Sequence, residues 1–440
     1  MNIAELQRFS EQLVQAGSMV TIHGRLVSIG PKGLVIAGLS KTVSLESFVS
    51  IDGPDGNCLA EVVYLDRDQI IAKPVKSQGK VHLGDKVTTL GASQLFPTEQ
   101  WKGRLVSGLG EPLDGKGPLP RGPKAIGFQG QPPQAAQRKS ISQRLKTGIR
   151  TIDIFTPLCI GQRMGIFAGS GVGKSTLMGL LARASSFDCV VVALVGERGR
   201  EVTDFVHEVL GPALEKSVVV VATGDETASL RKRAALLATS LAEYYRDQGQ
   251  NVLLLMDSVT RYAQALRELA LAGGEPPVSR GFPPSVFSDL PKLLERSGPG
   301  SGAGAITGIY SVLVDGDNHN EPVADAIRGT LDGHIVLSRQ IAASGRYPAI
   351  DILGSVSRLI DRALTKDEMK VSNDLRNLVS RFEDSKDLRA LGGYQPGKDL
   401  ELDRSVSFVP RLYGALNQSR FDRSEQDAFT AVAEMTKAGK

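Results

Sequence analysis

The stretch GIFAGSGVGKSTLMGLLARA, residues 165–184, decides the fold of this 440-residue chain. An apolar run, GIFA, leads into a glycine-rich turn, and the turn leads into apolar residues at helical spacing. A strand, a glycine-rich loop and a helix in this order form the context that a phosphate-binding loop requires. The glycines allow successive backbone N–H groups to face phosphate oxygens, and the helix N-terminus adds its positive end. The stretch therefore predicts an α/β core that binds a nucleotide.

Each residue of this loop has an expected role. We expect Lys174 to reach the β- and γ-phosphates and the Ser175 hydroxyl to contact Mg²⁺. Ala168 stands where the general motif has glycine, and Gly169 directly after it could supply the permissive turn. A chance glycine-rich turn is the alternative. The predicted nucleotide-binding residues here are Ala168, Gly169, Ser170, Gly171, Val172, Gly173, Lys174, Ser175 and Thr176.

The residues before this core have a different pattern. From about 18 to 95 the chain consists of short β-like runs such as MVTIHGRLVSIG and CLAEVVYLD, separated by turn sequences such as GPDG. Many short strands at close spacing predict a small β-barrel or sandwich. Ahead of them, residues 3–14 place apolar side chains at helical spacing, and Gly17 ends the pattern. This predicts a short amphipathic helix.

The segments that follow the barrel differ from each other in their predicted secondary structure. From 151 to about 362, near-continuous runs of Val, Leu and Ile alternate with helical patterns, which predicts a mostly parallel sheet covered on both faces. After about 363 the remaining segments are helical. We therefore expect an α/β core with an N-terminal β-barrel and a C-terminal helical domain. The expected divisions are 1–17 for the amphipathic helix, 18–95 for the barrel, 96–362 for the P-loop domain and 363–440 for the helical domain.

Composition excludes several classes of protein. Lys and Arg number 52 against 48 Asp and Glu, for a net charge of +4, and no long basic block accompanies this balance. Residues 18–95 contain few aromatics, so we expect no nucleic-acid partner. Three cysteines, far apart and without a C-x-x-C pair, argue against a disulfide framework and a zinc site. No signal-peptide pattern and no membrane-length apolar run occur, which predicts a cytoplasmic protein.

A second candidate site residue ends a buried strand. NVLLLMDS, residues 251–258, is an apolar run that closes on Asp257. An aspartate in this position beside a phosphate loop holds Mg²⁺, usually through water. The alternative is a helix N-cap, because a helical pattern begins directly after it.

A third candidate lies in VGERGREV, residues 195–202, which follows the apolar run CVVVAL. Glu197 ends that strand about two dozen residues after Lys174, and neighbouring parallel strands share their carboxyl edge. Glu197, Asp257 and the phosphate loop can therefore meet there. An exposed turn with solvated Glu and Arg side chains explains the same residues equally well.

Several motifs in one order resemble a known family. They are GQRMGIFAGSGVGKST, GERGREV, LLLMDSVTRYAQALRE, GEPP with GFPPSVF, and LDGHIVLSR followed by YPAIDILGSVSR. Together they resemble the catalytic subunits of the rotary-ATPase superfamily and, more narrowly, the type III export ATPases, of which the flagellar members power protein export. The resemblance covers essentially the whole chain and is dense from 161 to 358. It implies a RecA-like core, and an alanine at the start of the phosphate loop is ordinary in this family.

The resemblance implies roles for single residues. Glu197 matches the carboxylate that activates the attacking water, and Arg198 matches a residue that links this carboxylate to the neighbouring subunit. Glu201 belongs to the same motif without a defined role. Tyr347 resembles the aromatic side chain that stacks on adenine, with a buried packing tyrosine as the alternative. Arg358 resembles the arginine finger that reaches the neighbour's γ-phosphate, whereas the residues alone favour a surface salt bridge.

The resemblance further implies a function. It implies an ATPase with ATP and Mg²⁺ as cofactors, whose hydrolysis powers type III protein export during flagellum assembly. An injectisome secretion ATPase and the catalytic subunit of a rotary ATP synthase remain alternatives. The synthase subunit would need a non-identical partner, while this chain carries both Glu197 and Arg358.

The implied partners form a larger apparatus. They are further copies in a homohexamer, a dimeric stator-like regulator at the N-terminal helix, a central-stalk-like export protein, export chaperones, export substrates and the membrane export gate. The chain would be cytoplasmic and peripheral at the inner face of that apparatus. The segment VDGDNHNEP, residues 314–322, would lie near the channel of the ring.

Overall fold

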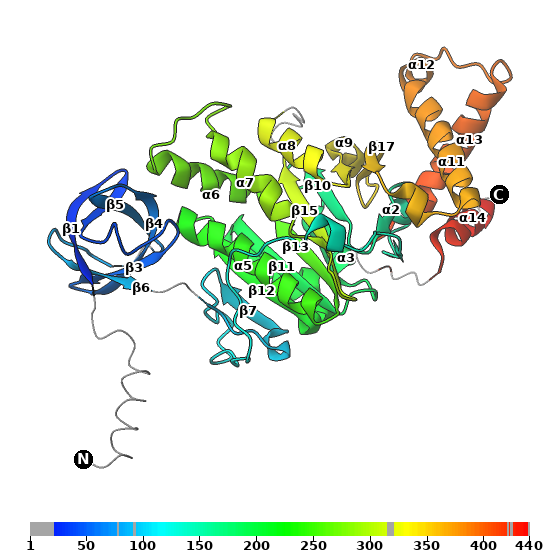
Figure 1. Cartoon of the computed structure of the whole chain (residues 1–440). Helices are drawn as coiled ribbons and strands as arrows, with labels where there is room; N and C mark the ends of the chain where they lie inside the picture. Colours follow the sequence, from blue (N-terminus) through cyan, green and yellow to red (C-terminus); the bar gives the residue numbers. More distant parts are fainter. Residues whose placement is uncertain are drawn as a thin grey trace. The chain divides into compact units, whose positions relative to one another are not determined.

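A computed structural model describes residues 22–76, 79–90, 94–314, 321–419, 422 and 426–438 (Figure 1). The expected N-terminal helix and most of the segment 314–322 lie outside these residues. The described residues form two compact units, one of residues up to 90 together with 227–229 and 268–276, and one of the remainder. The divisions at 17, 95 and 362 stay predictions. Within the described ranges no helix is long and apolar enough to cross a membrane.

The N-terminal strands close into the predicted barrel. Every pairing in it is antiparallel, in the order β1-β2-β5-β4-β3-β6. Alternate side chains point inward, as period-two alternation requires, and bury a core that includes Leu26, Ile36, Val49 and Ile70. The strands are β1 His23–Gly30, β2 Gly33–Ala37, β3 Phe48–Gly53, β4 Gly56–Leu65, β5 Gln69–Pro74 and β6 Lys86–Leu90.

A mostly parallel sheet forms the core of the larger unit. Its order is β17-β16-β10-β15-β13-β11-β12-β7, with β14 beside β15 (Figure 1). The valine runs of β11 and β12 are buried along nearly their whole length, so both faces of the sheet are covered. The strands are β7 Arg104–Ser107, β10 Arg163–Ala168, β11 Cys189–Glu197, β12 Ser217–Thr223, β13 Asn251–Asp257, β14 Gly298–Pro299, β15 Ala305–Leu313, β16 Gly333–Leu337 and β17 Ile350–Ser357.

Two strands depart from the simple alternation that the sequence predicts. β7 lies inside the Gly- and Pro-rich stretch expected as an extended crossover, and it adds a parallel edge to β12. β17 runs antiparallel to β16, with Gly333 opposite Ser357. The segment after β17 therefore leaves the sheet at the edge where β10 begins.

Helices and short elements complete the larger unit, to which all of them belong except residues 228–229 and 268–272. They are β8 Arg144–Leu145 paired with β9 Leu158–Cys159, α2 Arg150–Phe155, α3 Lys174–Ala182, α4 Gly199–Asp204, α5 Ala228–Asp247, α6 Val259–Ala272, α7 Pro284–Leu294, α8 Pro322–Thr330, α9 Arg339–Ala343 and α10 Ile360–Ala363. Shorter turns are η1 Glu99–Trp101, η2 Ala135–Gln137, η4 Gly211–Lys216 and the π-helical turn η3 Phe205–Leu210.

The C-terminal residues are helical, as predicted. The helices are α11 Lys366–Asp384, α12 Lys386–Ala390, α13 Leu400–Leu416 and α14 Ala428–Ala438. A capping box starts α11, because the Thr365 hydroxyl accepts from the Glu368 N–H while the Glu368 carboxylate accepts from the Thr365 N–H. Phe155 of α2 packs into the same apolar core as Val409 of α13.

A buried ion pair anchors the crossover before the core. Arg296 and Glu243 are 4% and 9% exposed. The guanidinium donates to both carboxylate oxygens at 2.9 and 2.7 Å, and to the Phe128 carbonyl at 2.9 Å. A Cβ on Gly130 would stand 2.2 Å from Glu243 Oε2, so only glycine allows the crossover to pass this close.

This pair generates a stability prediction. Arg296→Met should lower the free energy of unfolding by about 3–5 kcal/mol, because it leaves Glu243 buried without its partner. Urea or thermal unfolding of the purified protein measures the change. Lys80→Met, which removes one side of the exposed Lys80–Asp55 pair at 3.5 Å, is the control and should change little. Equal stability of both variants would contradict the anchoring role of Arg296.

Candidate functional site

The predicted phosphate loop joins β10 to α3. Gly171 and Gly173 have φ angles of 78° and 94°, a region that glycine enters without strain. Gly173 is the N-cap of α3, so the first N–H groups of the helix lie next to the loop. Ala168 is the last residue of β10 and is buried. Gly169, where the sequence predicted the permissive turn, does not have a positive φ, and Gly171 and Gly173 supply that conformation instead. This geometry is suited to a phosphate chain at a helix N-terminus.

Lys174 connects the loop to Asp257. Its ammonium forms an ion pair with Asp257 Oδ1, and that oxygen also accepts from the Ser311 hydroxyl at 2.6 Å. Asp257 is 3% exposed, at the end of β13. The helix that follows is capped by Ser258, whose hydroxyl accepts from the Arg261 N–H at 3.3 Å. The Asp257 carboxylate is therefore turned to the loop and not to helix capping.

Glu197 lies beside these two side chains. β11 and β13 are adjacent and parallel, with Leu194 opposite Asp257. Glu197 Oε1 lies 4.0 Å from Lys174 Nζ. Among the described residues, none donates a hydrogen bond to that buried oxygen. The three elements that the sequence expects at one sheet edge do meet there.

The surroundings raise the proton affinity of Glu197. Burial raises the pKa of this carboxyl to about 8, and the nearby Asp257 carboxylate adds to the effect, while Lys174 opposes it. A carboxyl with a pKa near neutrality can take up a proton from water and release it again. The site thus holds a basic group next to a predicted phosphate position.

The donor set fits a magnesium ion carried by a nucleotide. Asp257 and Glu197 place two carboxylates on adjacent strands, and the Ser175 hydroxyl lies in the first turn of α3. Magnesium is usually held by one or two carboxylates, water and substrate phosphates rather than by a full protein cage. Glu197 Oε1 is a buried acceptor that receives no hydrogen bond from the described residues, which fits a site that also binds water.

A small cavity adjoins the phosphate loop. Its volume is about 240 Å³. The Tyr347 ring forms one side, and two of its carbons lie 3.7 and 3.8 Å from where a Cβ on Gly173 would stand. The cavity is lined by Gly173, Thr176, Leu177, Leu180, Tyr347, Pro348, Gln418 and Ser419. An aromatic ring and aliphatic side chains suit a flat base.

Residues after α13 hold this cavity in place. The Tyr347 N–H donates to Asn417 Oδ1 at 2.9 Å, and the Gln418 N–H donates to the Tyr347 carbonyl at 2.7 Å. The buried side chain of Gln418 accepts from the Arg150 N–H at 2.7 Å and donates to the Gly148 carbonyl at 2.9 Å. We call these contacts the Gln418 clasp. It joins α2, the Tyr347 loop and the end of α13.

The charged loop after Glu197 is exposed. The Arg198 side chain is 88% exposed and lies 3.7 Å from Glu201, which is 51% exposed. Helix α4 begins at Gly199, directly after Arg198, and none of its residues is buried. Glu197 is therefore the buried member of the motif, and Arg198 and Glu201 face outward.

Arg358 is far from this site. It follows β17 directly, and its N–H donates to the Asp332 carbonyl at 2.9 Å. The Asp332 N–H in turn donates to the Arg163 carbonyl at 2.9 Å, at the start of β10. The phosphate loop follows the other end of β10, roughly 16 Å along the strand. Arg358 is thus a predicted site residue that the chain does not bring to its own phosphate loop.

Sequence reasoning missed two residues that shape the site, Ser311 and Gln418. Ser311 is a polar residue inside the apolar strand β15, and this is the one signal that could have indicated its contact with Asp257. Gln418 carries no such signal, because its role depends on contacts with residues some 70 and 270 positions away.

Comparisons with known proteins agree with this architecture. Residues 148–357 match the ATP synthase alpha/beta family, nucleotide-binding domain, and residues 364–435 match the T3SS EscN ATPase C-terminal domain. The chain is 49% identical over 438 residues to a flagellum-specific ATP synthase of Rhizobium meliloti, covering 99% of this chain and 94% of that protein.

Solved structures share the fold. The assembled ATPase EscN from the type III secretion system of enteropathogenic E. coli is 39% identical, with a TM-score of 0.87 over 94% of this chain and all of that one. EscN in complex with its central stalk EscO matches at 38% identity, with a TM-score of 0.85 and the same coverage. Identity and coverage at this level show common descent as well as a common fold. The chain belongs to the family of the flagellum-specific ATP synthases, within the ATP synthase alpha/beta family.

Proposed function

We propose that this chain hydrolyses ATP to power type III protein export during flagellum assembly. The observation that carries the proposal is the meeting of the phosphate loop, Lys174, Asp257 and Glu197 at one sheet edge. The identity to a flagellum-specific relative, higher than to EscN, supports the flagellar system over a virulence secretion system.

The phosphate chain of ATP takes the position offered by the loop. Backbone N–H groups of residues 169–175 and the Lys174 ammonium bind its oxygens, and Lys174 exchanges part of its contact with Asp257 for the phosphates. Ser175 and Asp257 would hold Mg²⁺, which would neutralise charge on the phosphates. Tyr347 stacks on the adenine in the neighbouring cavity.

Glu197 acts on the attacking water. Its free, buried Oε1 orients the water and accepts its proton as the oxygen attacks the γ-phosphorus. The carboxylate form is needed for this step, so the factors that raise the pKa of Glu197 also make it a stronger base. Hydrolysis then gives ADP and phosphate.

Arg358 completes the site of a neighbouring copy. Its position at the opposite end of β10 keeps its guanidinium away from its own phosphate loop. A second copy of the chain must therefore supply the arginine that stabilises transition-state charge. Arg198, whose side chain is exposed, would link Glu197 to that neighbour. We infer a homohexameric ring, and the solved structure of a relative as an assembled ATPase supports assembly.

Further partners follow from the same family. A central-stalk-like protein would occupy the ring, in analogy to EscO in its complex with EscN. A dimeric regulator at residues 2–16, export chaperones, export substrates and the membrane export gate complete the proposal. The protein would then work in the cytoplasm, peripheral to the export apparatus.

Hydrolysis should depend on assembly and on Glu197. We expect ATP turnover per chain to rise with protein concentration, because each site needs a neighbour. Glu197→Gln should lower kcat by about 10²–10⁴-fold through loss of the base, with nucleotide binding kept. Phosphate release and fluorescent-nucleotide titration measure the two quantities. Glu215→Gln, at an exposed glutamate of η4, is the matched control. Full turnover in Glu197→Gln would refute its role as the base.

Stability should depend on pH through the same residue. The pKa of Glu197 is raised from 4.5 to about 8 in the folded chain, so between these values folding binds a proton and stability falls as pH rises. Glu197→Gln lacks this loss. The nucleotide-free variant should therefore gain stability over the wild type by up to roughly 1.4 kcal/mol per pH unit across this window. Thermal unfolding of both proteins at several pH values measures the difference, and a constant difference would contradict the raised pKa.

Arg358→Ala should separate chemistry from binding. We expect kcat to fall by about 10³–10⁵-fold, as for other arginine fingers, while nucleotide affinity stays near that of the wild type. Arg67→Ala, at an exposed arginine of the barrel, is the matched control. Steady-state kinetics with sizing of the particle test this. Normal turnover of an assembled Arg358→Ala ring would exclude a finger at this position.

A further inference from the structure

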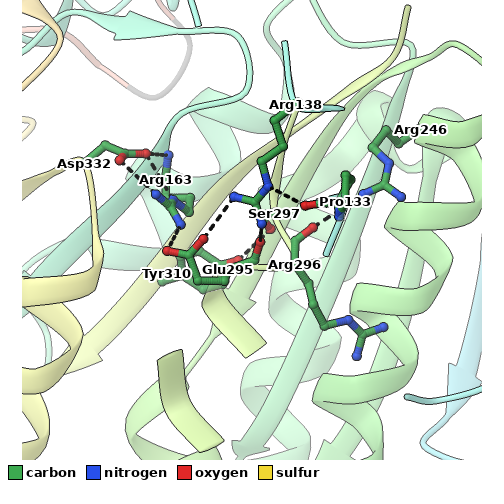
Figure 2. A network of polar contacts seen from close by, with 9 residues as sticks. All are labelled: Pro133, Arg138, Arg163, Arg246, Glu295, Arg296, Ser297, Tyr310 and Asp332. Carbon is green, nitrogen blue, oxygen red and sulfur yellow. Dashed lines mark hydrogen bonds and ion pairs between the residues drawn. The ribbon is translucent and has the colours of Figure 1, made fainter. Parts of the chain in front are cut away.

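A chain of ion pairs ends at the backbone of Arg358. It begins in the crossover segment at Arg138, passes through Glu295 and Arg163, and reaches Asp332 (Figure 2). The side chains come from four separate parts of the sequence. Arg163 is the first residue of β10, at the end of the strand opposite the phosphate loop, so these side chains lie outside the nucleotide site.

The Arg358 side chain and its backbone differ sharply in how they are held. The side chain is exposed, and no hydrogen bond or ion pair fixes its guanidinium within the described part of the chain. The backbone N–H is fixed by the Asp332 carbonyl at 2.9 Å. Where the guanidinium can reach is therefore decided by where Asp332 holds the chain.

Three groups of Asp332 make hydrogen bonds to Arg163 or Gln162: its carboxylate, its N–H and its carbonyl. Its carboxylate accepts from the Arg163 backbone N–H at 2.9 Å and from the Arg163 guanidinium at 3.2 and 3.1 Å. Its N–H donates to the Arg163 carbonyl, and its own carbonyl accepts from the Gln162 amide at 3.3 Å. Gln162 also donates to the Ser357 hydroxyl at 3.2 Å, directly before Arg358. A bidentate pair of this kind fixes orientation as well as distance.

Glu295 extends the network to two other segments. Its carboxylate pairs with Arg163 and, at 3.0 Å, with Arg138. Arg138 also donates to the Glu295 carbonyl at 2.8 Å and to the Pro133 carbonyl at 3.1 Å (Figure 2). Burial works against the charge of Arg163, but hydrogen bonds and attraction from Asp332 and Glu295 outweigh it and raise its pKa. The two arginines and the two carboxylates thus balance one another in charge.

From this geometry we propose that Asp332 and Arg163 are positioning residues for Arg358. Their network presents the Arg358 guanidinium to the phosphate loop of the neighbouring copy. This inference rests on the proposed role of Arg358. Transition-state stabilisation depends on donors fixed before the reaction, and a displacement of about 1 Å can cost on the order of a hundredfold in rate.

The inference makes a specific kinetic prediction. Asp332→Asn keeps the size and the backbone contacts of the residue but removes the charge that holds the Arg163 guanidinium. We expect kcat to fall by about 10- to 100-fold, with little change in KM, ring assembly or unfolding midpoint. Asp289→Asn, at an exposed pair with Lys292 on α7, is the matched control and should keep full activity. If Asp332→Asn does not assemble, Arg163→Lys replaces it as the test variant. This substitution keeps the positive charge but removes the bidentate contact with Asp332.

A mixing experiment separates positioning in trans from a general structural defect. Asp332→Asn chains retain Glu197, and Glu197→Gln chains retain an intact network. Equal amounts of the two, assembled together, would form about one site in four with an intact base and an intact finger. Activity well above the sum of the two parents supports the proposal. A merely structural defect in the Asp332→Asn chain would impair its own site, and mixing would restore nothing.

A second mixture identifies which proposal fails. Arg358→Ala mixed with Glu197→Gln tests the finger in trans by itself. Recovery in this mixture without recovery for Asp332→Asn overturns the positioning role and leaves the proposed function intact. No recovery in either mixture overturns the finger in trans, and the positioning role falls with it.

Discussion

The ion pair between Lys174 and Asp257 is the contact on which the site depends. It joins the phosphate loop to the end of β13 and lies almost fully away from solvent. The Lys174 ammonium and the Ser311 hydroxyl both contact this buried carboxylate, which offsets the cost of taking it out of water. The paired Asp257 then imposes its charge on Glu197, the next carboxyl along the sheet edge. The parallel register of β11 and β13 thus brings Glu197 and Asp257 to the same edge of the sheet as the phosphate loop.

Much of this could be predicted from the sequence because it follows from local patterns. The strand, glycine-rich loop and helix at residues 165–184 are contiguous, so their geometry is written in consecutive residues. The valine runs of β11 and β12 are typical of strands covered on both faces, and they are indeed buried. The meeting of Glu197 and Asp257 followed from the shared carboxyl edge of parallel strands. The roles of these residues in catalysis remain proposals.

Other features depend on contacts between distant segments, and local patterns do not reveal them. β7 is only Arg104–Ser107, too short to stand out in a Gly- and Pro-rich stretch, and it becomes a strand by pairing with β12. The antiparallel direction of β17 is fixed by its partner β16 and not by its own residues. The exposed side chain of Arg358 is indistinguishable in sequence from any surface arginine.

The Gln418 clasp couples α13 to the cavity that the Tyr347 ring lines. Because Gln418 holds the Tyr347 carbonyl with its backbone and the start of α2 with its amide, α13 cannot shift without moving one wall of that cavity. Under the proposed function, a load applied to α13 would therefore change how well the cavity fits the base of the nucleotide. Because such coupling is reciprocal, binding in the cavity would change the position or rigidity of α13 by the same free energy. Gln418 links the two through its backbone N–H and its side-chain amide.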